Sequence, residues 1–216
     1  MSTEPDDLAI PPGASTGRAV DRLINFSDAV VAVAITLLVL PIIDLRPGDG
    51  QTFAQLVAEN AAQLGVFIFT FLLVSLMWRV HNRVLNGIRA YDSTVFWVNT
   101  LWLTSIALLP WLSAQLGDSG WDTDTPDGTI GCAFWGTLGV TSLLTAAMSL
   151  YLRHHPALLQ PSERRDPSEG GIGRLRGLIF GAYFMASAVL CLFWPEWSHY
   201  AGIVIIPLSI WVRPAR

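Results

Sequence analysis

Six apolar segments, each close to the length needed to cross a lipid bilayer, constrain this chain more than any other feature. A membrane-spanning helix needs roughly 20 mostly apolar residues. We predict spans at residues 23–43, 61–80, 94–116, 130–152, 175–194 and 198–212. The last is short and contains Pro207, so we expect it to be tilted, kinked or packed at the periphery. None of the six alternates polar and apolar residues as a membrane barrel would. The sequence therefore predicts an all-α integral membrane protein.

The composition and the start of the chain agree with this class. Only 14% of the residues are charged, against roughly 25% in soluble domains. Residues 1–17 are rich in Pro, Gly, Ser and Thr, which predicts a disordered cytoplasmic tail ahead of a six-helix domain at residues 18–213. The first charged residues are acidic, so we expect no secretory signal peptide.

The arginines predict which ends of the spans face the cytoplasm. The chain has no lysine, and of its 13 arginines only Arg46 falls on one side of the predicted spans. The other 12 lie in the N-terminal tail, in the C-terminal tail, and in or at the edges of the loops after the second and fourth spans. Positive residues concentrate on the cytoplasmic side of membrane proteins. We therefore expect a multi-pass protein of the plasma membrane with both termini in the cytoplasm.

A polar run opens the first span. Arg22, Phe26, Ser27 and Asp28 lie at its start, and the residues that follow, 29–43, contain a single hydroxyl, on Thr36. A carboxylate inside a membrane helix costs a few kcal/mol on insertion scales unless partners or a function compensate. Arg22 and Asp28 are six residues apart, a poor spacing for an intrahelical pair. We therefore expect Asp28 to find its partners on other helices.

Depth along the helices suggests which partners these are. Asp28 lies just inside the first span, His81 follows the end of the second, and Asn99 is about five residues into the third. The three side chains can therefore meet near the cytoplasmic face. Such a cluster can be a buried polar lock that holds the helices in register. Alternatively, it can also couple to gating or proton sensing, with His81 as the titrating group.

An aliphatic stripe runs along the first predicted helix. With about 100° between successive residues, Val33, Leu37 and Leu40 lie within about 60° of one another, and Thr36 borders them. Ser27 and Asp28 point well away from this stripe. A stripe of this kind usually faces lipid or packs against a helix. In a symmetric oligomer, however, it would form stacked rings that can gate by dewetting, with Thr36 offering oxygens to an ion.

Several motifs resemble a known family. The Arg22-x-x-x-Phe26-Ser27-Asp28 run and the apolar residues 34–40 resemble the bacterial branch of the transmembrane protein 175 potassium channels. The similarity continues through Trp78-x-x-His81-Asn82, Asn99-x-x-Trp102 and Pro110. The remaining half of the chain agrees only in hydropathy. The motif evidence therefore covers roughly the first half of the sequence.

The resemblance implies a homotetramer of six-helix subunits in the bilayer, with the first helix of each lining a central pore. It implies constriction rings at Val33, Leu37 and Leu40 and a selectivity hydroxyl at Thr36, which would contact potassium only transiently. The charged motif residues would contact the second and third helices. The residues expected to brace the pore helix are Arg22, Phe26, Ser27, Asp28, Trp78, His81, Asn99 and Trp102.

Two positions depart from the family pattern. The first ring is usually Ile or Leu, whereas this chain has Val33, and the smaller side chain would widen that ring. The tightest layer would then be Leu37 or Leu40, and selectivity would be weaker than in relatives. Ala29 stands where the family commonly has Gly, a small change that we expect to be tolerated.

These features predict a channel that favours potassium and conducts passively, without a cofactor. A proton-coupled or other secondary cation transporter is the alternative, although the polar residues gather at one end rather than at the midplane where transporters bind substrate. The chain has no HExxH or GxSxG motif and no pair of aspartates on facing spans, so we expect no enzyme activity. Its arginines follow the membrane face, which gives no support for nucleic-acid binding.

Overall fold

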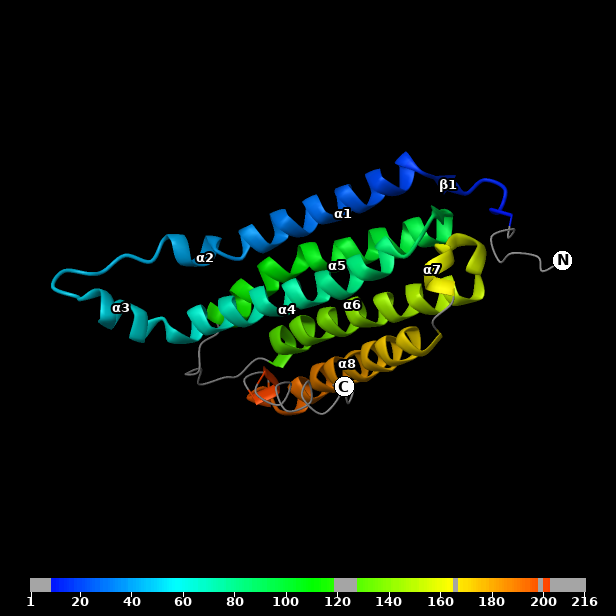
Figure 1. The fold of residues 1–216 in the computed structure, drawn as a ribbon. Helices are drawn as coiled ribbons and strands as arrows, with labels where there is room; N and C mark the ends of the chain where they lie inside the picture. The colour runs from blue at the N-terminus through cyan, green and yellow to red at the C-terminus, as the bar shows by residue number, and fades with distance from the viewer. Residues whose placement is uncertain (1–8, 119–127, 165–166, 198–199, 203–216) are drawn as a thin grey trace.

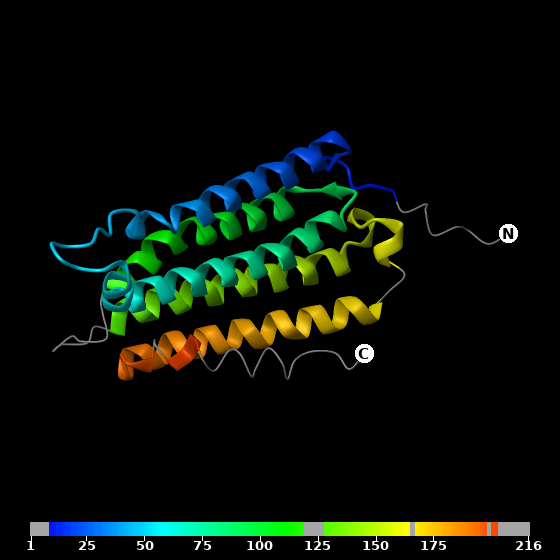
Figure 2. The ribbon, with the colours of Figure 1, turned by 60° about the vertical axis from the view of Figure 1, so that its left-hand side comes forward.

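Long, roughly parallel helices form an elongated bundle (Figures 1 and 2). The structure is a computed structural model, and it describes residues 9–118, 128–164, 167–197 and 200–202. The long helices are α1 (Arg18–Leu37), α4 (Ala61–Asn86), α5 (Ser93–Asp118), α6 (Gly128–His154) and α8 (Pro167–Phe193). The short elements are β1 (Ser15–Thr16), α2 (Leu40–Ile43), α3 (Phe53–Glu59), β2 (Ala90–Tyr91), η1 (Pro156–Leu158) and α7 (Pro161–Arg164).

Helices α1 and α8 lie on opposite sides of the bundle in both views (Figures 1 and 2). Helix α1 packs against α4 and α5, and α6 joins this group to α8. One long face of α1 and one of α8 are therefore left at the periphery of the subunit. This placement decides which side chains of α1 remain open to another molecule.

Four helical segments are long and apolar enough to cross a membrane: Arg18–Ile43, Ala61–Asn86, Ser93–Asp118 and Gly128–His154. They confirm the first four predicted spans, with helical ends that extend further because a helix can continue into the polar interface. The fifth prediction corresponds to the shorter apolar stretch Gly177–Phe193 of α8. Most of the sixth, at 198–212, lies outside the described residues. A mostly helical fold is thus confirmed, with four of the six predicted spans.

The first span is not one regular helix. The amides of Leu38 and Val39 donate to the carbonyls of Ile35 and Thr36, three residues back, at 3.3 Å each. Pro41 has no N–H group, so the carbonyl of Leu37 has no helical donor four residues later. Helix α1 therefore ends at Leu37, and Leu40 belongs to the short helix α2. The helical wheel used to place Leu40 assumes a regularity that the structure does not keep.

The N-terminal segment also differs from expectation. Ser15 and Thr16, expected in a disordered tail, form β1, which pairs antiparallel with β2 between α4 and α5. Gly17 adopts a positive φ of 54° at the turn between this strand and α1. The prediction is therefore wrong for these residues, because strand pairing satisfies their backbone groups. Residues 1–8 lie outside the described residues.

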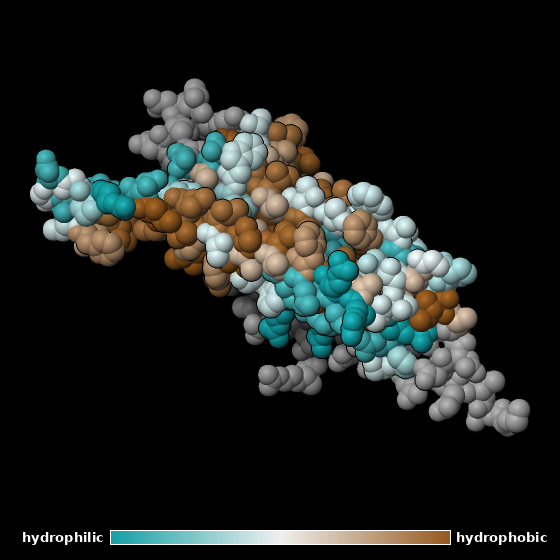
Figure 3. All heavy atoms as spheres, turned by 90° about the horizontal axis from the view of Figure 1, so that it is seen from above, coloured by the Kyte–Doolittle hydropathy of each residue, from teal (hydrophilic) through white to brown (hydrophobic). Residues whose placement is uncertain are grey.

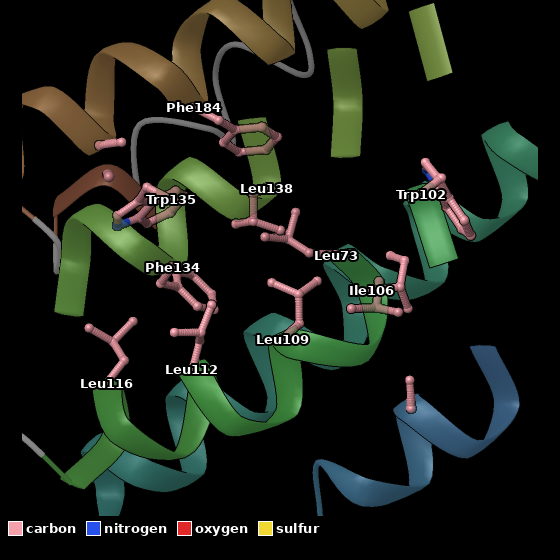
Figure 4. Close-up of a cluster of buried hydrophobic side chains, with 14 of the residues drawn as sticks. Leu73, Trp102, Ile106, Leu109, Leu112, Leu116, Phe134, Trp135, Leu138 and Phe184 are labelled. Carbon is pink, nitrogen blue, oxygen red and sulfur yellow. The ribbon is translucent and has the colours of Figure 1, made fainter. Parts of the chain in front are cut away.

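The main core fills the space between α4, α5, α6 and α8. In Figure 4, leucines of α5 point towards Phe134 and Leu138 of α6, and Phe184 of α8 lies near Trp135. A second apolar cluster packs the end at which α1 begins, and it includes Val20, Leu85 and Leu158. Burial of these side chains fixes the rotation of α5 and α6, and thereby the support on which α1 rests.

Glycine allows α6 and α8 to approach closely. A Cβ atom built on Gly128 would lie 1.9 Å from the carbonyl oxygen of Cys191, and one on Gly139 would lie 2.6 Å from the Met185 sulfur. Small residues commonly permit such close helix contacts in membranes, where backbone packing drives association.

Candidate functional site: the first helix and its polar support

One face of α1 is buried against α4 and α5. Its buried residues recur at intervals of three and four, the period of a helix face. They are Val20, Leu23, Ser27, Val31 and Ala34, followed by Leu38 just beyond the helix. This buried face includes Ser27 of the polar motif. The rest of the motif must therefore lie at its edge or on other faces.

The predicted ladder lies on the outward face of α1 and α2. Val33 is 57% exposed, Leu37 41% and Leu40 54%, and Phe26, at 61%, extends the same face. Figure 3 looks onto the α1 side of the molecule and shows an apolar band between polar ends. The three proposed ring residues thus keep a large exposed surface, Val33 and Leu37 on α1 and Leu40 on α2.

Thr36 is exposed on the same side. Its Oγ1 donates a hydrogen bond of 2.8 Å to the carbonyl of Val33 on its own helix. A hydroxyl has one proton and two lone pairs. The proton is committed to the backbone, so the lone pairs of Oγ1 are oriented away from that carbonyl and can serve a cation.

Asp28 is held by two donors on α4. The indole Nε1 of Trp78 donates to Asp28 Oδ1 at 2.7 Å, and Asn82 Nδ2 donates to the same oxygen at 2.8 Å. Trp78 and Asn82 are four residues apart and therefore lie on one face of α4. The carboxylate thus finds its partners on another helix, as expected.

Ser27 belongs to a separate chain of hydrogen bonds. Asn99 Nδ2 donates to Ser27 Oγ at 2.9 Å, and Ser27 Oγ donates to the carbonyl of Leu23 at 2.8 Å. The other end of the Asn99 amide, Oδ1, lies 2.9 Å from His81 Nε2. Since Oδ1 can only accept, this geometry assigns the proton of a neutral His81 to Nε2. The chain connects α4, α5 and α1.

His81 and Trp102 form a buried ring pair behind α1. Their ring centroids are 3.8 Å apart and their planes differ by 3°. His81 is 1% exposed and Trp102 is completely buried. Among the described residues, His81 Nδ1 and Trp102 Nε1 have no hydrogen-bond partner. The stacked rings give α4 and α5 a flat, rigid contact at the level of Ser27.

The expectation that Asp28, His81 and Asn99 form one cluster is wrong. Asp28 bonds to Trp78 and Asn82, whereas His81 and Asn99 connect to Ser27. The reason is angular, because adjacent residues on a helix point about 100° apart. The prediction used only the depth of the three residues in the membrane. The four-residue spacing of Trp78 and Asn82, which puts both on one face of α4, would have indicated them as the partners of Asp28.

Arg22 does not make the interhelical contacts expected of it. Its side chain is exposed, and within the described part of the chain it makes no hydrogen bond or ion pair. Phe26 is likewise exposed on the outward face rather than packed in the bundle. Both residues therefore remain available to surroundings outside the single subunit.

A second polar group ties α5 to α6 near the start of α1. The Tyr151 hydroxyl and the backbone amide of Val95 donate to the Asp92 carboxylate, and the His155 ring stacks on Tyr151. Burial raises the pKa of Asp92, but these hydrogen bonds, the Thr94 amide and the nearby charge of His155 lower it. The net pKa lies below the ordinary value of 3.8. No motif in the sequence predicts this group, since its members are far apart in the chain.

Comparison with known proteins supports the sequence resemblance. Residues 22–110 match the family model for the endosomal/lysosomal potassium channel TMEM175. The human endosomal/lysosomal proton channel TMEM175 is 26% identical over 195 residues, which are 87% of this chain but 37% of that protein. A potassium channel of Streptomyces collinus is 33% identical over 98 residues, 45% of this chain and 47% of that one. This chain therefore spans well under half the length of the animal relatives it matches.

The fold has a counterpart in a solved structure. The crystal structure of a lysosomal potassium-selective channel TMEM175 homolog from Chamaesiphon minutus aligns with a TM-score of 0.72 at 18% identity. The alignment covers 92% of this chain and all of that one. The family is one of ion channels, in agreement with the prediction that this chain is not an enzyme. Residues 22–110, which match the TMEM175 family model, contain the polar motif and the outward ladder, and the long apolar helices are those of a multi-pass membrane protein.

Proposed function

We propose that the chain is a subunit of a potassium-favouring cation channel in which the first helices of four copies surround a passive pore. The observation that carries this proposal is the arrangement of α1: an apolar ladder faces outward, while Ser27 and Asp28 of the polar motif bond to other helices of the bundle. Four copies around an axis would turn that ladder into stacked rings.

The chemistry of the ladder fits a dewetting constriction. Branched aliphatic side chains offer no ligands to an ion, so a ring of them opposes passage of a hydrated cation. Thr36 would supply oxygens between the layers of Val33 and Leu37. Potassium holds its hydration water less tightly than sodium does, so a partly dehydrating passage favours potassium. Val33 in place of a larger residue would leave Leu37 or Leu40 as the narrowest layer.

The polar network would act as a brace rather than as the ion path. Asp28 is joined to α4, and Ser27 is joined through Asn99 to His81, so both contacts hold α1 from behind. A pore helix must keep its rotation within a fraction of a helical turn for its rings to align. Two separate bonding sets, about 100° apart on α1, resist rotation in both directions.

Flux measurements on ladder variants test the channel. Purified protein in liposomes should pass potassium faster than sodium down a gradient. Leu37→Ala should raise total cation flux several-fold and reduce the preference, because it removes three carbons from each of four side chains at the constriction. Leu192→Ala is the matched control, since Leu192 is 52% exposed on α8, on the opposite side of the bundle. Unchanged flux and preference across Val33, Thr36, Leu37 and Leu40 variants would sink the proposal.

Proton permeation is a second candidate, and the names of the animal relatives favour it. The same liposomes can be loaded with a pH indicator and given a proton gradient without potassium. Acidification blocked by the ladder variants would favour a proton path along α1. Saturable potassium flux that requires a proton gradient would instead favour a proton-coupled transporter.

The membrane placement follows the charge distribution. We infer a plasma-membrane protein with both termini in the cytoplasm, because the end of the bundle where α1 begins carries the arginines that flank α4 and α6. No cofactor is required for passive conduction through such a pore.

A further inference from the structure

The proposed pore helix is interrupted near its outer end, between α1 and α2. Helix α1 ends at Leu37, and Leu38 and Val39 form a turn. Leu40 is the first residue of the short helix α2. Pro41 cannot donate to the Leu37 carbonyl, so the regular ladder of bonds does not connect these two leucines. The direction in which Leu40 points is therefore not determined by α1 alone.

Gln63, in the first turn of α4, reaches this discontinuity. Its Nε2 donates to the carbonyl of Pro41 at 3.3 Å and to Asp118 Oδ1, at the end of α5, at 3.1 Å. A carboxamide nitrogen carries two protons, so both bonds can form together. Both partners are acceptors, which requires the NH₂ end of the side chain to face them. One amide group thus joins α2, α4 and α5.

Gly117 on α5 leaves room for the Gln63 side chain. Gly117, beside Asp118, is buried, and a Cβ atom built on it would lie 3.3 Å from both Cα and Cγ of Gln63. A Cβ atom there would press on the backbone and the side-chain stem of Gln63, so glycine leaves room for this close approach. The close approach is independent of the hydrogen bonds and points to the same contact.

We propose that Gln63 is a positioning residue that clamps the Pro41 segment against α4 and α5 and thereby sets the direction of the Leu40 side chain. The inference rests on the proposed function, in which Leu40 forms the outer ring. Because Pro41 directly follows Leu40 in the chain, holding the Pro41 carbonyl limits how far that ring can tilt. Gln63 itself lies beside the pore helix and does not face the ion path.

Two measurements on the full chain in lipid test this role. The rate of hydrogen exchange at the amides of residues 42–46 shows how firmly the Pro41 segment is held. The potassium-to-sodium flux ratio in liposomes shows whether the Leu40 ring has changed. Gln63→Leu keeps the side-chain bulk and removes the donor, while Gln63→Glu also places a second carboxylate near Asp118. Gln115→Leu is the matched control, because Gln115 is exposed on α5 near the same end of the bundle.

Both Gln63 variants should speed exchange at residues 42–46 by about two- to tenfold, the effect of losing one typical hydrogen bond. They should also lower the potassium-to-sodium flux ratio several-fold, and Gln115→Leu should change neither quantity. Unaltered exchange would overturn the clamp. Faster exchange with an unaltered ratio, in a protein where Leu40→Ala lowers that ratio, would overturn the link to the ring. If Leu37→Ala and Leu40→Ala also leave flux unaltered, the proposed function itself fails.

Discussion

At the scale of single residues, two neighbours in the polar motif support α1 in different ways. Ser27 is buried and connects through Asn99 to His81, whereas Asp28 is half-buried and accepts two hydrogen bonds from α4. One helical step separates them, and that step turns the side chain by about 100°. The motif therefore contacts two neighbouring helices at one level.

Asp28→Ala should destabilise the protein by about 1–3 kcal/mol, because it removes the charged acceptor of two hydrogen bonds, from Trp78 and Asn82. Asp28→Asn should cost less, since its amide oxygen can still accept. Thermal unfolding in detergent checks the order. Equal losses for the two variants would mean that the charge of Asp28, rather than its acceptor oxygen, provides the stabilisation.

Because the folded pKa of Asp92 is lowered, the stability of the protein should fall at acidic pH. A carboxylate with a lowered folded pKa adds stability above its unfolded value, here 3.8, and loses it as the pH falls through the lower folded pKa. Asp92→Asn should therefore lower the unfolding temperature at neutral pH and flatten its decline below about pH 4. Thermal unfolding at several pH values measures this. A parallel shift of the whole pH profile would contradict the linkage.

At the scale of elements, α1 has one buried face and one exposed face, whereas α6 and α8 pack closely because glycines lie at their contact. Ala34 and Val31 pack inward on α1, and Val33 faces outward, so alternate faces have opposite roles. Between α6 and α8, by contrast, the contact reaches the backbone itself at Gly128. A change at that contact should alter stability far from the ladder.

Gly128→Ala should cost about 1–3 kcal/mol, because its Cβ would overlap a backbone carbonyl that no side-chain rotation can move. Gly65→Ala on α4 is the control, since a Cβ there meets nothing within 4 Å and alanine favours the helix by up to about 1 kcal/mol. Unfolding temperatures in detergent should thus fall for the first and hold or rise for the second. A similar fall for both would show that any glycine replacement is harmful.

At the scale of the whole molecule, the outward apolar face of α1 requires a covering. Phe26 and the ladder residues would expose a continuous apolar band, and in a monomer only lipid could cover it. Our proposal places three further copies of the chain there. In this proposal the contacts that assemble the four copies also form the pore.

Native mass spectrometry of the protein released from lipid nanodiscs should give about four times the chain mass of 23.6 kDa. Replacing Phe26 by Glu on the outward face should shift the distribution towards smaller species, because four carboxylates would approach one another near the axis. A monomer that retains cation flux would contradict the four-copy pore.

Much of the architecture could be predicted from the sequence. The first four spans and the outward stripe on α1 follow from apolar length and helical period, which are local properties of the chain. The need of Asp28 for partners on other helices follows from the cost of a buried carboxylate. The motif that begins at Arg22 also indicated the resemblance to the TMEM175 family, because it combines polar residues that rarely occur together at a membrane boundary.

Only the tertiary structure decided the pairings. Which residue meets Asp28 depends on the rotation of α4, and that rotation is set by packing in the core rather than by any residue near Asp28. The same holds for the backbone pairing of β1 with β2 and for the bond from the Gln63 side chain to the Pro41 carbonyl, both of which join separate segments of the chain. The sequence by itself thus determined which faces and spans exist, and packing determined which of them touch.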